Sequence, residues 1–268
     1  MNPFRHLLKR SGHHAPVGTW LMSASPLMAE AAGLAGFDWA VIDMEHAPLD
    51  MGDVVHLLQA VSATRMVPVV RVPWNDTVTI KRVLDAGATT LLVPFVQNAD
   101  EAAAAVAATR YPPQGVRGMA GMSRAAQYGL APDHFKNANR AVSVIVQIES
   151  EVALGNLEAI ARVDGVDALF VGPADLSGSM GLTGQVDHPR VAKAMADAVR
   201  RCHAVGKPVG TIGVEPDAVV GYRAAGYDFL AVGSDLGLFV QCALKSIAAL
   251  HSTDAEHVHD LAGGTREA

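Results

Sequence analysis

The sequence is poor in the features that redox, membrane and nucleic-acid-binding proteins depend on. It has two cysteines, Cys202 and Cys242, in no Cys-x-x-Cys pattern, so we expect two reduced, buried thiols. No segment approaches the roughly 18 apolar residues of a membrane span. The net charge of -6 leaves no basic face for nucleic acid. Residues 1–12 lack the apolar stretch of a signal peptide, which predicts a cytoplasmic protein.

What the chain does contain is enough apolar material for one full-sized α/β domain. Half of its 268 residues are hydrophobic and 18% are charged, which excludes wholesale disorder. A single α/β barrel typically needs about 250 residues. No Gly-x-Gly-x-x-Gly pattern follows the first expected strand, so a dinucleotide-binding fold is disfavoured.

Short β-branched segments alternate with alanine-rich helical segments along the chain. Strands are expected at Val17–Met22, Trp39–Asp43, Val67–Val72, Thr90–Val96, Ser143–Ile148, Ala168–Val171, Pro208–Ile212 and Phe229–Val232. Helices are expected at Pro26–Gly36, Met51–Ala63, Asp76–Ala86, Ala99–Thr109, Glu151–Ala161, Pro189–Val205, Pro216–Ala225 and Leu236–Leu250. Eight such units predict an α/β fold, a closed (β/α)8 TIM barrel in one domain, residues 1–250; an open doubly wound sheet is the alternative.

Two segments fall outside this alternation. Tyr111–Arg140, which precedes the fifth strand, is rich in Pro, Gly, Met and Arg and is too long for a simple loop. We expect it to fold over the barrel or to join an oligomer interface. Residues 251–268 are polar and Gly-rich, and we expect a frayed tail there.

Charged and polar side chains recur where the apolar strands end. The active sites of such barrels lie at the C-terminal ends of the strands, so these exits converge on one rim. The four polar exits are Asp43-Met44-Glu45-His46, Arg71, Gln147-Ile148-Glu149 and Gly172-Pro173-Ala174-Asp175.

Glu149 and Asp175 have the character of ligands for a hard cation. Two carboxylates with several open positions suit Mg²⁺ or Mn²⁺, which keep waters and accept substrate oxygens. A zinc site made from His and Cys is less well supported. The alternatives are that Glu149 is an acid at the start of the next helix and that Asp175 is a turn residue after Gly-Pro.

His46 is the candidate acid–base residue. Asp43, three residues earlier, can orient the imidazole and increase its basicity, which predicts a His–Asp pair. The alternative is an exposed loop histidine, since the chain has 11 His in all. For Glu45 we favour a cap on the next helix over a water-bridged metal contact.

Arg71 leaves an otherwise apolar strand. Its guanidinium can bind a carboxylate or ketone oxygen and stabilise an enolate, or it can pair with an acid of a neighbouring strand. Gln147 lies on the same side of its strand as Glu149, because side chains alternate with period two. Lys81 and Lys207 are not at strand exits, which argues against a Schiff-base mechanism.

From Gly18 to about Ala249 the chain resembles the HpcH/HpaI aldolase family. Within that family it is most similar to the pyruvate aldolases of 4-hydroxy-2-oxo acids and deoxy sugar acids. The motifs that carry the resemblance are Asp43-Met44-Glu45-His46, Val70-Arg71-Val72-Pro73-Trp74-Asn75, Lys81–Ala88, Arg110–Gly118, Gln147-Ile148-Glu149 and Val171–Ser177.

The resemblance implies a class II aldolase that cleaves 4-hydroxy-2-oxo acids to pyruvate and an aldehyde through a metal-held pyruvate enolate. Glu149 and Asp175 would bind Mg²⁺, Mn²⁺ or Co²⁺, and Arg71 would contact the ketone oxygen. His46, paired with Asp43, would handle the proton of the aldol hydroxyl. Further substrate contacts would come from Asp175, Gln147 and the backbone at Gly172, Pro173 and Ala174, although Pro173 has no N–H to donate.

The resemblance leaves the aldehyde and the pathway open, since both aromatic and sugar-acid catabolism use such enzymes. After Gly118 the chain departs from the family pattern, and we expect Ser123 and Arg124 to meet an acidic or hydroxylated aldehyde. Ile212 is expected to line the same pocket. Family members commonly form hexamers in which the last helix packs on a neighbour, and Leu236–Leu250 is apolar enough to do so.

Three other functions compete with this one. An oxaloacetate decarboxylase needs the same metal and enolate, so these residues do not separate it from an aldolase. A lyase of CoA thioesters needs a basic patch at the barrel mouth, for which Arg117 and Arg124 are the candidates. A non-catalytic scaffold would have lost one of the four key side chains, and all are present: Glu149, Asp175, Arg71 and His46.

Overall fold

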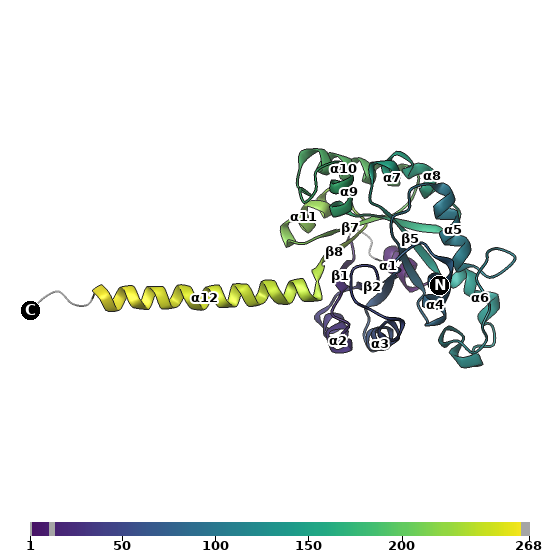
Figure 1. Cartoon of the computed structure of the whole chain (residues 1–268), viewed down its shortest axis with the longest axis horizontal. Coiled ribbons are helices and arrows are strands. Elements are labelled where there is room, and N and C mark those ends of the chain that lie inside the picture. The colour runs from purple at the N-terminus through teal and green to yellow at the C-terminus, as the bar shows by residue number, and fades with distance from the viewer. Residues whose placement is uncertain (1, 11–13, 264–268) are drawn as a thin grey trace, which may run out of the picture.

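The computed structural model describes residues 2–10 and 14–263, and its eight strands close into a parallel barrel (Figure 1). The strands are β1 (Val17–Leu21), β2 (Trp39–Asp43), β3 (Val67–Arg71), β4 (Thr90–Val93), β5 (Ser143–Ile148), β6 (Val166–Val171), β7 (Val209–Gly213) and β8 (Phe229–Ser234). Strand β1 pairs with both β2 and β8. This closure confirms the (β/α)8 barrel and excludes the open sheet.

Helices cover the outside of the barrel, and most begin at a side chain that caps them. They are α1 (Pro3–Arg10), α2 (Pro26–Ala35), α3 (Met51–Ser62), α4 (Thr77–Asp85), α5 (Ala99–Thr109), α6 (His134–Ala141), α7 (Glu151–Gly155), α8 (Leu157–Ala161), α9 (Pro173–Ser179), α10 (Pro189–Ala204), α11 (Pro216–Ala224) and α12 (Asp235–Gly263). Ser25, Asp76 and Asn98 each accept a bond from the amide three residues on. The single helix expected over residues 151–161 is broken at Asn156, whose side chain donates to the Gln97 carbonyl.

Aromatic rings fill the barrel interior toward its amino-terminal end. The Phe4 ring, carried by α1, meets Trp39 and Phe229 edge-on at centroid distances of 6.2 and 5.2 Å. Gly18 and Gly210 leave room for these two rings, because a Cβ at either position would overlap the indole or the phenyl group. Helix α1 was not expected from the sequence, and it closes the floor of the barrel.

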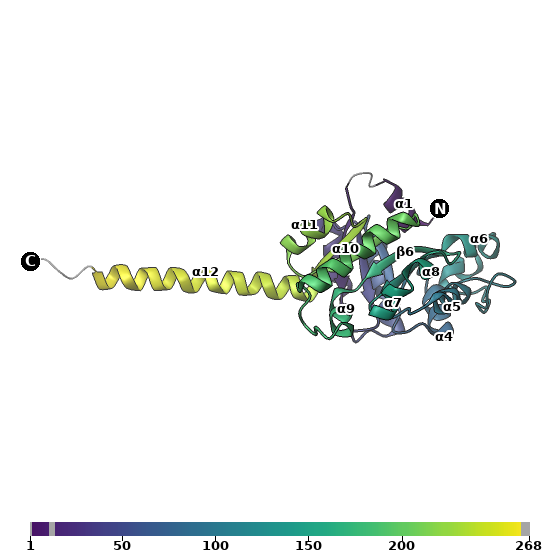
Figure 2. The ribbon, with the colours of Figure 1, turned by 90° about the horizontal axis from the view of Figure 1, so that it is seen from above.

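The long connection before β5 lies at the amino-terminal end of the barrel. It contains a short 3-10 helix (Arg124–Gly129) and α6, and it joins the end of α5 to the beginning of β5 (Figures 1 and 2). Arg124 Nη1 donates to the Ala86 carbonyl at 3.0 Å, and Arg117 pairs with Asp85 at 2.7 Å. This segment therefore packs beside α4 on the side away from the strand exits.

Helix α12 leaves the barrel and projects outward as a single rod (Figures 1 and 2). It has 29 residues and continues past Leu250 to Gly263, because no Gly or Pro interrupts it earlier in that segment. Residues 251–263 of the expected frayed tail are thus helical, and 264–268 lie outside the described residues. Cys202 is buried as expected, but Cys242 on α12 is exposed. No helix among the described residues is long and apolar enough to span a membrane.

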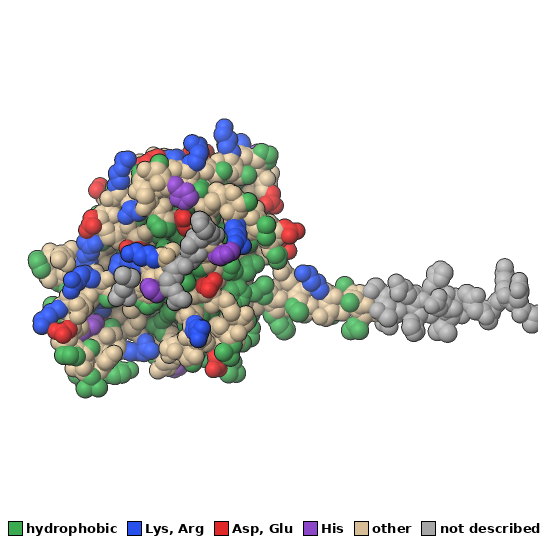
Figure 3. All heavy atoms as spheres, turned by 180° about the vertical axis from the view of Figure 1, so that it is seen from behind, with side chains coloured by type: hydrophobic (Ala, Val, Ile, Leu, Met, Phe, Trp, Pro, Cys, Tyr) green, Lys and Arg blue, Asp and Glu red, His purple; other side chains and the backbone are tan. Residues whose placement is uncertain are grey.

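Apolar side chains are exposed along the part of α12 nearest the barrel (Figure 3). They recur at helical spacing, which gives α12 an apolar stripe without a partner among the described residues: Leu236, Phe239, Val240, Leu244, Ile247 and Leu250.

Candidate active site

Asp43 and Arg71 form a buried ion pair at the exits of β2 and β3. The two residues are direct partners in the β2–β3 register. The guanidinium donates from Nε and Nη2 to the two Asp43 oxygens at 2.9 and 2.7 Å. Asp43 therefore binds Arg71 and not the His46 imidazole, and the expected His–Asp pair is wrong. The strand register decides this, because it places the guanidinium opposite Asp43 while His46 lies beyond the strand end.

Glu45 is a site residue that the sequence interpretation assigned wrongly. It does not cap α3, whose N-cap is Asp50. Asp43 Oδ1 accepts the Glu45 amide at 3.0 Å, and this bond turns the chain after β2. The Glu45 carboxylate then lies 3.0 Å from Arg71 Nη1 and 4.0 Å from His46 Nε2. Burial raises the pKa of Glu45, although Arg71 acts in the opposite direction.

The His46 imidazole is largely solvent-exposed, with 59% of its side-chain surface accessible. It lines the same cavity as Asp43 and Arg71. It is thus free to meet a substrate, and among the described residues Glu45 is the carboxylate nearest to it.

Glu149 is a buried carboxylate fixed on three sides. Gln147 Nε2 donates to its Oε1, and the Phe95 amide donates to its Oε2 at 3.1 Å. A Cβ on Gly172 would lie 2.7 Å from Oε1, so only glycine leaves this space open. Ser150, not Glu149, is the N-cap of α7. Glu149 therefore points into the barrel, which excludes the helix-start alternative.

The electrostatics around Glu149 fit a bound cation. Burial and the nearby carboxylates of Glu45 and Asp175 raise the pKa of Glu149 to about 7. Gln147 Oε1 is buried and has no hydrogen-bond partner among the described residues. Within the described chain no three His, Cys, Asp or Glu side chains form a complete ligand set. The donors present are oxygens with open positions, as Mg²⁺ or Mn²⁺ prefer.

One cavity of about 490 Å³ collects most of these side chains at the strand exits. Helix α9 begins directly after Gly172 and carries Asp175 in its first turn. The predicted residues that line the cavity are His46, Asp43, Arg71, Gln147, Glu149, Gly172, Pro173, Ala174, Asp175 and Ile212. No lysine lines it among the described residues.

Two of the expected contacts change in the structure. The Gly172 amide donates to the Ile148 carbonyl at 3.3 Å, so of the backbone at Gly172, Pro173 and Ala174 only the Ala174 amide is available to an anion. Ser123 does not reach the cavity of its own chain, because its hydroxyl caps the 3-10 helix at the opposite end of the barrel. The order of elements was the signal for this, because a loop that follows a helix of the barrel returns to the amino-terminal end.

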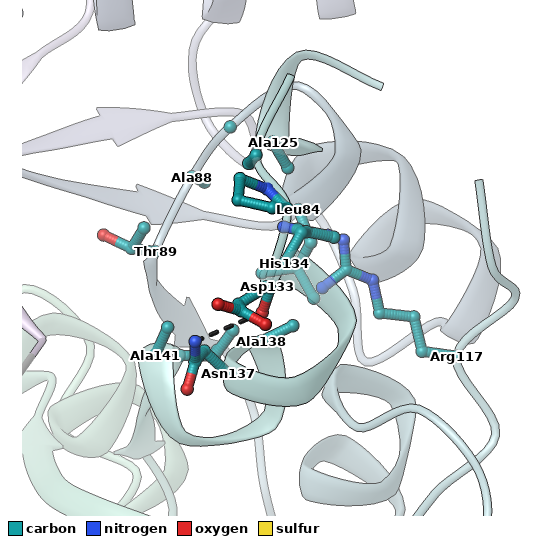
Figure 4. A pocket seen from close by; sticks show the side chains of 14 residues that line it. Leu84, Ala88, Thr89, Arg117, Ala125, Asp133, His134, Asn137, Ala138 and Ala141 are labelled. Carbon is teal, nitrogen blue, oxygen red and sulfur yellow. Dashed lines mark hydrogen bonds between the residues drawn. The ribbon is translucent and has the colours of Figure 1, made fainter. Parts of the chain in front are cut away.

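A second cavity, of about 420 Å³, lies at that opposite end between α4 and α6 (Figure 4). Arg117 and His134 are among the residues around it. The Arg117 Cζ atom lies 4.5 Å from the centroid of the Tyr111 ring, over its face. The Tyr111 hydroxyl is hydrogen-bonded to His134 Nε2 at 3.3 Å. Arg117 and Arg124 are therefore at the end of the barrel away from the strand exits, and neither lines the strand-exit cavity as a CoA site would need.

Fold and site together define a (β/α)8-barrel enzyme whose chemistry takes place at the carboxyl ends of its strands. Residues 17–242 match the model of the HpcH/HpaI aldolase/citrate lyase family, and the chain belongs to this family. It is 49% identical to the 2-dehydro-3,6-dideoxy-6-sulfogluconate aldolase of Pseudomonas putida, over 93% of this chain and 97% of that enzyme. It is 48% identical to the 5-keto-4-deoxy-D-glucarate aldolase of Enterobacter sp. strain 638, over 83% and 87%.

The fold is also similar to a solved structure of the same family. A HpcH/HpaI aldolase/citrate lyase family protein from Burkholderia cenocepacia J2315 superimposes with a TM-score of 0.90 and 42% sequence identity. The match covers 94% of this chain and 100% of that one. With aldolases at nearly half identity over almost its whole length, the protein is a carbon–carbon lyase.

Proposed function

We propose that the protein is a divalent-metal-dependent aldolase that cleaves 4-hydroxy-2-oxo acids to pyruvate and an aldehyde. The observation that carries this proposal is the buried Glu149, which lies near Asp175. Both carboxylates line the same cavity as the Arg71–Asp43 pair. Glu149 and Asp175 would hold Mg²⁺, Mn²⁺ or Co²⁺. When bound, the metal supplies Lewis acidity toward the ketone of pyruvate.

Arg71 provides the fixed positive charge in this proposal. A guanidinium has five N–H groups, of which Asp43 takes two. Its remaining donors can bind the oxygen on which negative charge develops as the enolate forms. The ion pair with Asp43 keeps the guanidinium in place before substrate arrives, so the interaction needs no reorganisation during the reaction.

His46 would take the proton of the C4 hydroxyl as the carbon–carbon bond breaks. Its imidazole is exposed in the cavity and can approach the hydroxyl directly or through one water. The free Ala174 amide would bind the pyruvate carboxylate. Because both named relatives act on sugar acids, we place the substrate among deoxy sugar acids and not among products of aromatic breakdown.

A second copy of the chain is the proposed partner of α12. The exposed apolar stripe on this helix is suited to pack on a neighbouring barrel. Members of the family that the chain resembles commonly form hexamers. Burial of such a stripe would remove several large apolar side chains from water.

The test is pyruvate release from 4-hydroxy-2-oxo acids, followed by coupling to lactate dehydrogenase. Protein stripped with EDTA should be inactive, and Mg²⁺, Mn²⁺ or Co²⁺ should restore activity. Activity that survives stripping would refute the metal mechanism. Absence of activity on every 4-hydroxy-2-oxo acid, together with turnover of oxaloacetate, would favour a decarboxylase.

A further inference from the structure

The half of the cavity away from Glu149 is formed by the exit of β7, helix α11 and the beginning of α12. Its apolar wall includes Ile212 and Leu238. Two carboxylates, Asp187 and Glu215, line the same region. In the proposed reaction pyruvate occupies the Glu149 side, so this half receives the aldehyde.

Both carboxylates are placed to accept hydrogen bonds. Gln241 Nε2 donates to Glu215 Oε1 at 3.0 Å, which leaves Oε2 open. Burial and then the charge of Asp187 raise the pKa of the Tyr222 hydroxyl, so Asp187 lies near that ring. Neither carboxylate has an ion-pair partner among the described residues.

No free positive charge balances these acids. Arg71 is the one Lys or Arg among the described residues that line the cavity, and Asp43 and Glu45 already bind it. Arg124, which the sequence offered as a contact for an acidic aldehyde, lies at the other end of the barrel. A bound divalent cation would be neutralised by its own two carboxylate ligands. The residues that this chain contributes to the aldehyde half therefore carry a net negative charge.

We infer that the aldehyde partner is an uncharged, hydroxylated aldehyde whose O–H groups donate to Asp187 and Glu215. An aldehyde with a carboxylate, sulfonate or phosphate at its far end would be repelled by the same two groups. This inference rests on the proposed aldolase function. It predicts an aldehyde of different charge from what the names of the two relatives imply, since a sulfogluconate carries a sulfo group and a glucarate a second carboxylate.

Glycolaldehyde and glyoxylate are a matched pair of probes, because they differ only in a CH2OH group against a carboxylate. Aldol synthesis from pyruvate and each aldehyde, with Mg²⁺ present at low ionic strength, should give a kcat/KM about fivefold higher for glycolaldehyde, a moderate effect because Asp187 and Glu215 are both solvent-exposed. D187N/E215Q should narrow this ratio by about fivefold, because the repulsion is removed. Glu30→Gln, an exposed acid on α2 outside the cavity, is the control and should leave the ratio unchanged.

The possible outcomes distinguish a failure of the proposed aldolase function from a failure of the inference about its aldehyde. If wild-type protein prefers glyoxylate, or if the ratio is the same in D187N/E215Q, the aldolase stands and the inference about its aldehyde is overturned. A cation contributed by a second copy of the chain would produce that result. If neither aldehyde reacts, the proposed function itself fails and this inference falls with it.

Discussion

At the scale of single residues, Glu149 couples folding to protonation. Its pKa is about 7 in the folded protein against an ordinary value of 4.5. Between these pH values the folded protein holds a proton that the unfolded chain has released. The free energy of unfolding of metal-free protein should therefore fall as pH rises from about 4.5 to 7, by up to about 3 kcal/mol.

Glu149→Gln removes this titration, so its stability should change less with pH over the same window. Urea denaturation at a series of pH values measures the difference, with Glu30→Gln as a variant expected to follow wild type. Saturating Mg²⁺ at pH 7 should raise wild-type stability and leave Glu149→Gln nearly unchanged. Parallel pH curves for wild type and Glu149→Gln would contradict the assignment.

Arg71 and His46 should differ in the reactions they support. Arg71→Ala leaves Asp43 buried without its partner and removes the charge that, in the proposed mechanism, stabilises the enolate. Both aldol cleavage and oxaloacetate decarboxylation should fall by at least about a hundredfold. His46→Ala should reduce aldol cleavage by about a hundredfold or more and affect decarboxylation far less, since decarboxylation has no alcohol proton to remove. Equal losses of both activities in His46→Ala would rule out its role as the base.

At the scale of the elements, the position of the Glu149 carboxylate depends on the exit of β6 as well as on β5, the strand that Glu149 follows. Gly172→Ala would place a methyl group 2.7 Å from Glu149 Oε1 and push the carboxylate aside. We expect metal affinity, measured by isothermal titration calorimetry with Mn²⁺, to fall about tenfold or more. Gly52→Ala on α3, where a Cβ meets nothing within 4 Å, is the matched control and should bind metal as wild type does.

The strands were the most predictable elements. Continuous apolar segments gave β2 and β5 with their observed bounds, because burial on both faces leaves a clear pattern. The fourth strand was expected to end at Val96, but β4 ends at Val93. Phe95 adopts a left-handed conformation with φ 53°, which does not continue a strand. Helix α1 escaped prediction because a short, charged helix has no long periodic pattern of its own.

The residues of the site were easier to predict than their partners. That polar side chains gather at the strand exits follows from the barrel alone. The choice of Arg71 over His46 as the partner of Asp43 depends on strand register, which the sequence does not specify. The position of Ser123 depends on which face its loop occupies, and a loop that follows a helix returns to the amino-terminal end. That rule of connection could have corrected the expectation before the structure did.

At the scale of the whole molecule, the proposed role of α12 in assembly can be tested directly. Its exposed apolar stripe should pack against a second copy, so charged residues on the stripe should prevent association. Phe239→Glu combined with Leu244→Glu should give a smaller species by light scattering after size-exclusion chromatography. The exposed Lys245→Glu change lies on the same helix and should not alter the mass. A monomer in both wild-type and variant protein would refute the proposed partner.

The aromatic floor has a consequence for the order of kinetic events. Phe4, Trp39 and Phe229 close the barrel from below, so substrate and both products must share the mouth above. In the proposed reaction pyruvate would sit at the buried Glu149 and the aldehyde nearer the opening, so the aldehyde would leave first. Cleavage should then be an ordered reaction with one substrate and two products. Pyruvate should inhibit it competitively with respect to the 4-hydroxy-2-oxo acid, and the aldehyde noncompetitively.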